Sequence, residues 1–199
     1  MREFIEDIGM VLTDPSTLIA TARAEGRSLG RPFLFVVIFS LGLASGLSIP
    51  ITILLSSILP IELGIWIYAM VLVFGILAGI VLWIIDSVFM YLLSILFNGR
   101  GSFSDTMEAL GYAYAATWPI ALFGSLSILT GWFVGLALLV IGIVIEIIWR
   151  IYSMVLALAE AHGYSVAKGV LIVLLSRCLE VAIVMVISMA IALSMSMLS

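Results

Sequence analysis

Two short charged runs stand inside apolar segments that are long enough to cross a bilayer. They are Glu146-Ile-Ile-Trp-Arg150 and Arg177-Cys-Leu-Glu180. An ionised side chain near the bilayer centre costs roughly 2.5 to 3.5 kcal/mol even on the lenient insertion scale, so it persists only with a partner, a water-filled cavity or a function. The chain must therefore fold so that these charges meet one another or meet water.

The composition agrees with a membrane environment. The sequence is 64% hydrophobic and only 10% charged, and its mean hydropathy is +1.36. Water-soluble domains are about half apolar and about a quarter charged. We therefore expect an all-α polytopic membrane protein. The formal net charge of -4 gives no basic surface for nucleic acid, so we expect no nucleic-acid partner.

The apolar pattern predicts a bundle of five transmembrane helices. The expected crossings lie at about 33–59, 66–97, 106–129, 132–161 and 166–197. The second crossing would measure roughly 48 Å against a hydrocarbon thickness of about 30 Å, so it must tilt or overhang, and we expect an overhang on the cytoplasmic side. The count falls if the stretch before Pro119 is an interfacial helix that enters the membrane only at the proline.

Residues 1–32 are expected to form a cytoplasmic, amphipathic N-terminal region. Apolar residues recur at helical spacing before Asp14-Pro15, which reads as an N-cap residue followed by proline at the first position of a second helix. The two short helices either lie on a surface and contact headgroups or a partner, or serve only as a topogenic leader. The acidic face of the first helix, through Glu3, Glu6 and Asp7, disfavours contact with headgroups.

Basic residues predict the orientation. Six of them fall in the N-terminal region or in the two loops on its side: Arg2, Arg23, Arg27, Arg31, Arg100 and Lys168. The loops around Glu62 and Thr130 contain none. Because positive residues stay on the cytoplasmic side, the N-terminus is expected in the cytoplasm and the C-terminus outside.

The charges inside the apolar segments share one expected depth. Asp86, Arg150 and Arg177 each lie eleven residues from the expected cytoplasmic end of their helix, which is about 16 Å and close to the midplane. Glu146 and Glu180 lie one turn deeper, beside Arg150 and Arg177 by the i,i+4 and i,i+3 rules. We expect the five side chains to face the bundle interior as one intramembrane charge cluster.

This cluster has two possible meanings. One is a buried ionic clamp that fixes the register of the helices. Alternatively, it is a polar pathway or binding pocket in which the carboxylate in excess takes up a proton or a cation. The sequence leaves both open.

Catalytic and metal-binding constellations are absent from the sequence. His162 is the only histidine and Cys178 the only cysteine, so neither a helical zinc motif nor a serine or metal protease site can be assembled. We expect a protein that is not an enzyme and that uses no metal or cofactor.

Small residues recur at four-residue spacing in three of the expected helices. The pairs are Gly42 and Gly46, Gly75 and Gly79, and Gly131 and Gly135. Such spacing lets helix backbones approach closely in a membrane. The glycines are expected to pack helices within the chain or, alternatively, to form a dimerisation face.

One stretch resembles a known family. The run Gly111-Tyr112-Ala-Tyr-Ala-Ala-Thr-Trp-Pro119 follows the Gly99-Arg-Gly-Ser-Phe103 loop and precedes a helix-turn-helix around Glu160 to Lys168. From about Asp14 to the C-terminus, this order of motifs resembles the Yip family of Ypt/Rab-interacting membrane proteins, in its short prokaryotic form. Gly111, Tyr112 and Pro119 match the positions of the family motif.

The resemblance implies a multipass membrane protein that acts as a non-enzymatic scaffold or interaction protein, in membrane organisation or trafficking. Its expected partners are the lipid bilayer and a second copy or another protein on the cytoplasmic side. The expected location is a prokaryotic plasma membrane. The alternative, which follows from the charge cluster, is a small transporter or an ion or proton channel.

Overall fold

The computed structural model describes residues 2–26, 28–56, 61–130 and 132–198, and the chain is helical throughout these ranges apart from short connections. In chain order the elements are α1 (Arg2–Thr13), α2 (Pro15–Ala24), α3 (Gly30–Ser56), α4 (Ile61–Leu96), α5 (Phe103–Ala113), the 3₁₀ helix η1 (Tyr114–Thr117), α6 (Trp118–Thr130), α7 (Trp132–His162) and α8 (Val166–Leu198). The all-α class is as predicted.

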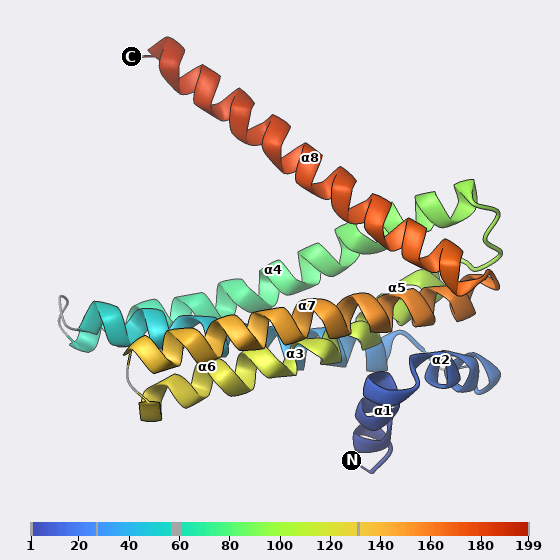
Figure 1. Ribbon diagram of the computed structural model, residues 1–199, viewed down its shortest axis with the longest axis horizontal. Coiled ribbons are helices and arrows are strands. Elements are labelled where there is room, and N and C mark those ends of the chain that lie inside the picture. The colour runs from blue at the N-terminus through green and yellow to red at the C-terminus, as the bar shows by residue number, and fades with distance from the viewer. Residues whose placement is uncertain (1, 27, 57–60, 131, 199) are drawn as a thin grey trace.

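Four helices run side by side as a bundle, namely α3, α4, α6 and α7 (Figure 1). At one end of the bundle α1, α2 and α5 pack against it; these three helices are called the helical cap below. Helix α8 starts at the cap end, packs against α4 and α7, and then diverges from the bundle (Figure 1). Residues 181–186 of α8 are all exposed, as expected for a lipid-facing helix.

The local signals in the N-terminal region are confirmed. Asp14 is the N-cap residue of α2, and its carboxylate accepts a hydrogen bond from the backbone N–H of Thr17 at 3.2 Å. The hydroxyls of Thr17 and Ser16 also donate to it, and these bonds lower the pKa of Asp14 below its usual value. Pro15 occupies the first turn, where its missing N–H costs nothing.

Helices α1 and α2 are docked on α7. The indole N–H of Trp149 donates to the carbonyl of Leu12 at 3.0 Å, and the Ser153 hydroxyl donates to the carbonyl of Val11 at 3.3 Å. The Arg23 guanidinium reaches the carbonyl of Ala161 at the end of the same helix. The N-terminal region is therefore an integral part of the folded chain.

The third expected helix is interrupted. Instead of one helix over 106–129, the chain forms α5, the 3₁₀ turn η1 and the short helix α6. Pro119 causes the break, because its ring clashes with the carbonyl four residues earlier, that of Ala115, and it has no N–H to donate to it. The N–H of Trp118 donates to that carbonyl instead, so the 3₁₀ turn satisfies it.

Four of the described helices are long and apolar enough to cross a membrane. They cover Gly30–Ile49, Ile65–Leu96, Phe133–His162 and Val166–Ala190. Helix α6 has 13 residues, about 20 Å of helix, which is shorter than the hydrocarbon layer of about 30 Å. Four of the five expected crossings thus have a matching helix. By the length and composition of the described helices, the predicted count of five crossings is not confirmed.

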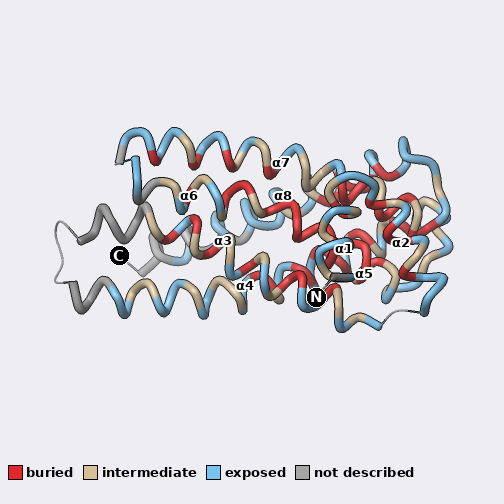
Figure 2. The backbone as a smooth tube through the Cα atoms, turned by 90° about the horizontal axis from the view of Figure 1, so that it is seen from below, coloured by how far each residue is buried: buried red, intermediate tan, exposed pale blue. Residues whose placement is uncertain are grey.

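Buried residues gather at the cap end of the molecule (Figure 2). The largest fully buried side chains include Tyr112, Tyr114, Phe35 and Leu18. In contrast, α4 presents exposed apolar side chains along most of its length. A packed core at one end and an apolar surface along the bundle are what a bilayer-embedded bundle with a folded cap requires.

Candidate functional site

The charge cluster is centred on Asp86 of α4. The carboxylate, in a residue only 4% exposed, accepts two hydrogen bonds from the Arg177 guanidinium of α8, at 3.1 Å from Nη1 and 2.9 Å from Nη2. Such a bidentate pair is the strongest common arrangement of these groups. Nη2 of Arg150, from α7, lies 3.7 Å from Oδ2 of Asp86, the oxygen that Nη2 of Arg177 also contacts. One carboxylate therefore joins three helices.

The two remaining carboxylates each pair with an arginine on their own helix. Glu146 lies 3.3 Å from Nη1 of Arg150, four residues later. Glu180 forms an ion pair with Arg177 and also accepts a hydrogen bond from the Ser176 hydroxyl at 2.9 Å. The structure thus brings all five residues into one connected group, with three carboxylates facing two guanidiniums.

Tyr114 of the 3₁₀ turn packs against the cluster. The Arg150 guanidinium lies over the ring of Tyr114, 4.7 Å from its centroid, which is a cation–π contact. The Tyr114 hydroxyl donates to the carbonyl of Gly79 at 2.9 Å. Tyr114 was not singled out from the sequence, although it stands two residues after Tyr112 in a short aromatic run. The 3₁₀ turn places it there.

A cavity of about 430 Å³ adjoins the cluster. Asp86, Arg150, Arg177 and Glu180 form its polar wall, and apolar residues of α4 and α8 form the rest. The Glu146 carboxylate is not part of this wall. The carboxylates are therefore paired, yet the cluster is not sealed off from open space between α4 and α8.

The depth of the cluster depends on which helix ends overhang the membrane. Along α4, Asp86 lies about 15 Å from the last residue, Leu96, but about 30 Å from Trp66 near the other end, at 1.5 Å per residue. Helix α4 has 36 residues, so it exceeds the hydrocarbon layer by more than 20 Å. The expectation that the cluster lies near the midplane depends on counting residues only from the cap end of each helix.

Most of the predicted glycines lie at close helix contacts. A Cβ at Gly42 or Gly46 would meet α6, at 3.3 Å from Ala121 and 2.3 Å from the carbonyl oxygen of Ile120. A Cβ at Gly75 would lie 2.4 Å from the Ala44 side chain. Gly79 faces α3 in the same way, at Ser40. Gly135 is buried, and Gly131 lies outside the described residues. The contacts seen are all within the chain.

The motif residues lie in the cap and at the start of α6. A Cβ at Gly111 would lie 2.6 Å from Pro32, at the start of α3. Tyr112 is buried and meets Phe35 edge-on, with ring centroids 5.0 Å apart. Pro119 opens α6, after the 3₁₀ turn. The motif therefore joins the cap to the bundle at the level of the charge cluster.

The lone histidine and cysteine take separate positions. His162 ends α7 and is buried against the cap, where its Nε2 lies 2.9 Å from the Thr106 hydroxyl. Cys178 is exposed on α8. Within the described ranges, no group of three or more His, Cys, Asp or Glu side chains is arranged to hold a metal ion.

These features define a class, a helical membrane protein with several apolar helices, a folded cap and an ionic cluster that joins three helices. The chain belongs to the Yip1 domain family, whose model matches residues 9–189. It is 33% identical over 105 residues to the uncharacterized protein MJ0794 of Methanocaldococcus jannaschii, a match that covers 52% of this chain and 74% of that protein. No solved structure matches the chain.

Proposed function

We propose that this Yip1-family protein is a non-enzymatic membrane scaffold, in which the charge cluster is a structural clamp. The observation that carries the proposal is the pairing of every carboxylate in the cluster with an arginine, with Asp86 joined to both. A clamp of this kind holds α8, whose residues 181–186 and 188–190 are exposed, against α4 and α7. It needs no mobile ion to neutralise its guanidiniums.

We also propose five crossings with a cytoplasmic N-terminus, in a prokaryotic plasma membrane. The chain leaves α4 at the cap end and enters α7 at the opposite end (Figure 1), so the segment between them traverses the bundle. Its last two elements, η1 and α6, have 4 and 13 residues, about 27 Å at the usual rise of 3₁₀ and α helices. This length supports a fifth crossing, and the basic residues near the cap support the orientation.

The surface offered to a protein partner is the outer face of α1. Phe4 packs against Phe35 on the inner face, whereas Ile5 is 62% exposed and stands between the exposed acidic residues Glu3 and Glu6. An exposed apolar side chain with acidic neighbours fits a partner that presents an apolar group among basic ones. The acidic residues disfavour anionic headgroups as the target of this face, and Glu3 also forms an ion pair with Arg31 of the same chain.

A photoreactive residue tests this surface. Placed at position 5 in the intact chain and activated in host membranes, it should crosslink to a discrete protein or to a second copy. The same residue at position 133, which is exposed at the opposite end of the bundle, should label lipid only.

A protease test addresses the orientation. An N-terminal tag should be cleaved by protease in inverted vesicles and protected in right-side-out vesicles.

Equal protein crosslinking from both positions, or none from position 5, would remove the interaction surface. Protection of the tag in inverted vesicles would reverse the orientation.

The alternative is a small transporter or an ion or proton channel. The cavity of about 430 Å³ beside the cluster favours it. Three carboxylates and two guanidiniums leave one negative charge in excess, which a proton or a cation in this cavity would neutralise. It requires flux across a membrane, which the scaffold proposal does not.

A further inference from the structure

An apolar groove runs between α3 and α4 and shares only Leu82 and Arg150 with the lining of the cavity described above. It has a volume of about 550 Å³, within the range of roughly 300 to 1,000 Å³ typical of small-molecule sites. Its lining on α4 extends from Ile67 to Leu82, about 22 Å of helix. Several lining residues, including Met70 and Phe74, are exposed, so the groove opens to the surface that the bilayer covers.

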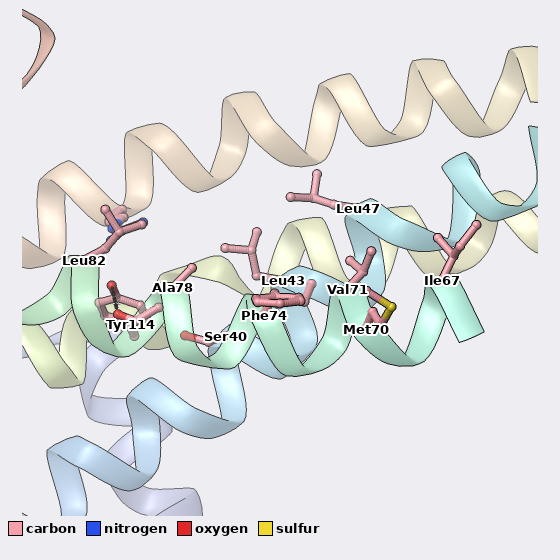
Figure 3. A pocket seen from close by; sticks show the side chains of 14 residues that line it. Ser40, Leu43, Leu47, Ile67, Met70, Val71, Phe74, Ala78, Leu82 and Tyr114 are labelled. Atoms are coloured by element: carbon pink, nitrogen blue, oxygen red, sulfur yellow. Dashed lines mark hydrogen bonds between the residues drawn. The ribbon is translucent and has the colours of Figure 1, made fainter. Parts of the chain in front are cut away.

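One end of this groove is polar and the rest is apolar. Figure 3 shows Tyr114 and Ser40 toward the end marked by Leu82, and Met70 and Ile67 toward the other. Arg150 also lines the groove, which links its polar end to the charge cluster. The shape and polarity are those of a site for one long apolar chain with a small polar head.

Two polar groups at this end have no hydrogen-bond partner among the described residues. They are the hydroxyl of Ser40, a residue only 1% exposed, and Nε of Arg150. A buried polar group without a partner costs roughly 1 to 3 kcal/mol. Both groups can donate a hydrogen bond, so a head that carries acceptor oxygens would satisfy them.

The charge of the cluster restricts that head further. The other two nitrogens of the Arg150 guanidinium already face Glu146 and Asp86, and the five cluster residues carry three carboxylates against two guanidiniums. A carboxylate or phosphate head would add a negative charge to a group that already has one in excess, which is unfavourable at low dielectric. A neutral head with ester or ether oxygens avoids this cost.

We propose that the groove is a binding site for a neutral glycerolipid. Its chain lies along α4 between Leu82 and Ile67, and an ester or ether oxygen of its head accepts hydrogen bonds from Ser40 and from Arg150 Nε. The site differs from ordinary lipid contact at the bundle surface because it selects the head by charge and by hydrogen bonding. It also differs from the partner surface on α1.

A photoactivatable monoacylglycerol with a diazirine in its chain tests the site on the full-length protein in detergent micelles. Labelling should saturate at one probe per chain and map to residues 43–47 and 67–74. Ala78→Trp places a large side chain in the groove from an exposed position and should reduce labelling about tenfold, a difference of about 1.4 kcal/mol. Ala137→Trp, at an exposed position of α7 outside the groove, is the matched control and should label like the parent.

Two further arms keep the proposal falsifiable if Ala78→Trp does not fold. Ser40→Ala should reduce labelling about fivefold, the factor that corresponds to about 1 kcal/mol for one hydrogen bond. It should at the same time leave the lipid-free protein as stable as the parent or more stable, because it removes an unpaired hydroxyl. The matching diazirine fatty acid should label about tenfold less than the monoacylglycerol.

Equal labelling of Ala78→Trp and Ala137→Trp, or of Ser40→Ala and the parent, would reduce the groove to ordinary bilayer contact. If the fatty acid labelled the protein as strongly as the monoacylglycerol does, the proposed selectivity for a neutral head would be wrong.

Discussion

Asp86→Asn lowers the free energy of unfolding by about 3 to 5 kcal/mol, the loss expected when one partner of a buried ion pair is removed. The reason is geometric. Asp86 holds both guanidiniums of the cluster, and its loss leaves Arg150 and Arg177 close together with only the carboxylates of their own helices. The interactions that join α4 to α7 and α8 at this level disappear. Reversible unfolding in mixed micelles, followed by the signal of tryptophan fluorescence, measures the change.

Net charge alone predicts a different result. Removing any one of the three carboxylates leaves a neutral cluster, so Glu180→Gln is the matched control. Among the described residues Glu180 forms an ion pair with Arg177 alone, and it is less buried than Asp86, so its substitution should cost less than half as much. In the double variant Asp86→Asn with Arg177→Gln, the loss should be smaller than the sum of the two single losses, because both substitutions remove the same ion pair. Equal effects of the two single variants would show that the cluster acts through net charge and not as a clamp.

Gly124→Ala is expected to destabilise the protein by about 3 kcal/mol, the upper part of the usual range for overpacking. A Cβ at Gly124 would lie 2.0 Å from the carbonyl oxygen of Gly46 and 2.6 Å from its Cα. Both are backbone atoms, which cannot turn away as a flexible side chain does. Helix α6 would have to move away from α3, and the same measurement of unfolding detects it.

The matched control is the same substitution at Gly9. Gly9 lies in α1, and apart from the nearby backbone of that helix no atom of the described residues lies within 4 Å of its potential Cβ, so alanine should stabilise the helix by up to about 1 kcal/mol. The two identical substitutions should therefore have opposite signs. A Gly124→Ala variant as stable as the parent would show that the backbones of α3 and α6 lie further apart at Gly46 and Gly124 than the structure has them.

The sequence predicted the members of the charge cluster because spacing within a helix is a local property. The separations of four residues between Glu146 and Arg150, and of three between Arg177 and Glu180, place each pair on one helix face. The cost of an isolated charge in an apolar segment then requires the pairs to meet a partner. That Asp86 bridges both arginines could not be predicted, since it depends on how α4, α7 and α8 cross.

Other features depend on tertiary packing and escaped prediction for the same reason. Pro119 marked a point at which the helix could enter the membrane. The position of the break followed from the clash of its ring with the carbonyl of Ala115, which shortened α6 and placed Tyr114 next to Arg150. The amphipathic pattern of α1 indicated a buried face without saying that Trp149 of α7 would meet it. The groove lined by Ser40 has no signal in the sequence, because no motif marks an unpaired hydroxyl.

The measurement that tests the central claim most directly is ion and proton flux through the purified protein in liposomes, with stability followed on the same preparations. The parent, Glu146→Gln and Arg150→Met are compared with protein-free liposomes. If the cluster is a clamp, no preparation shows flux above the protein-free level. Both variants are then less stable than the parent, and Arg150→Met, which also loses the contact with Asp86, is the less stable of the two. A flux in the parent that disappears in a stably folded Glu146→Gln variant would contradict the clamp and make this protein a transporter or channel.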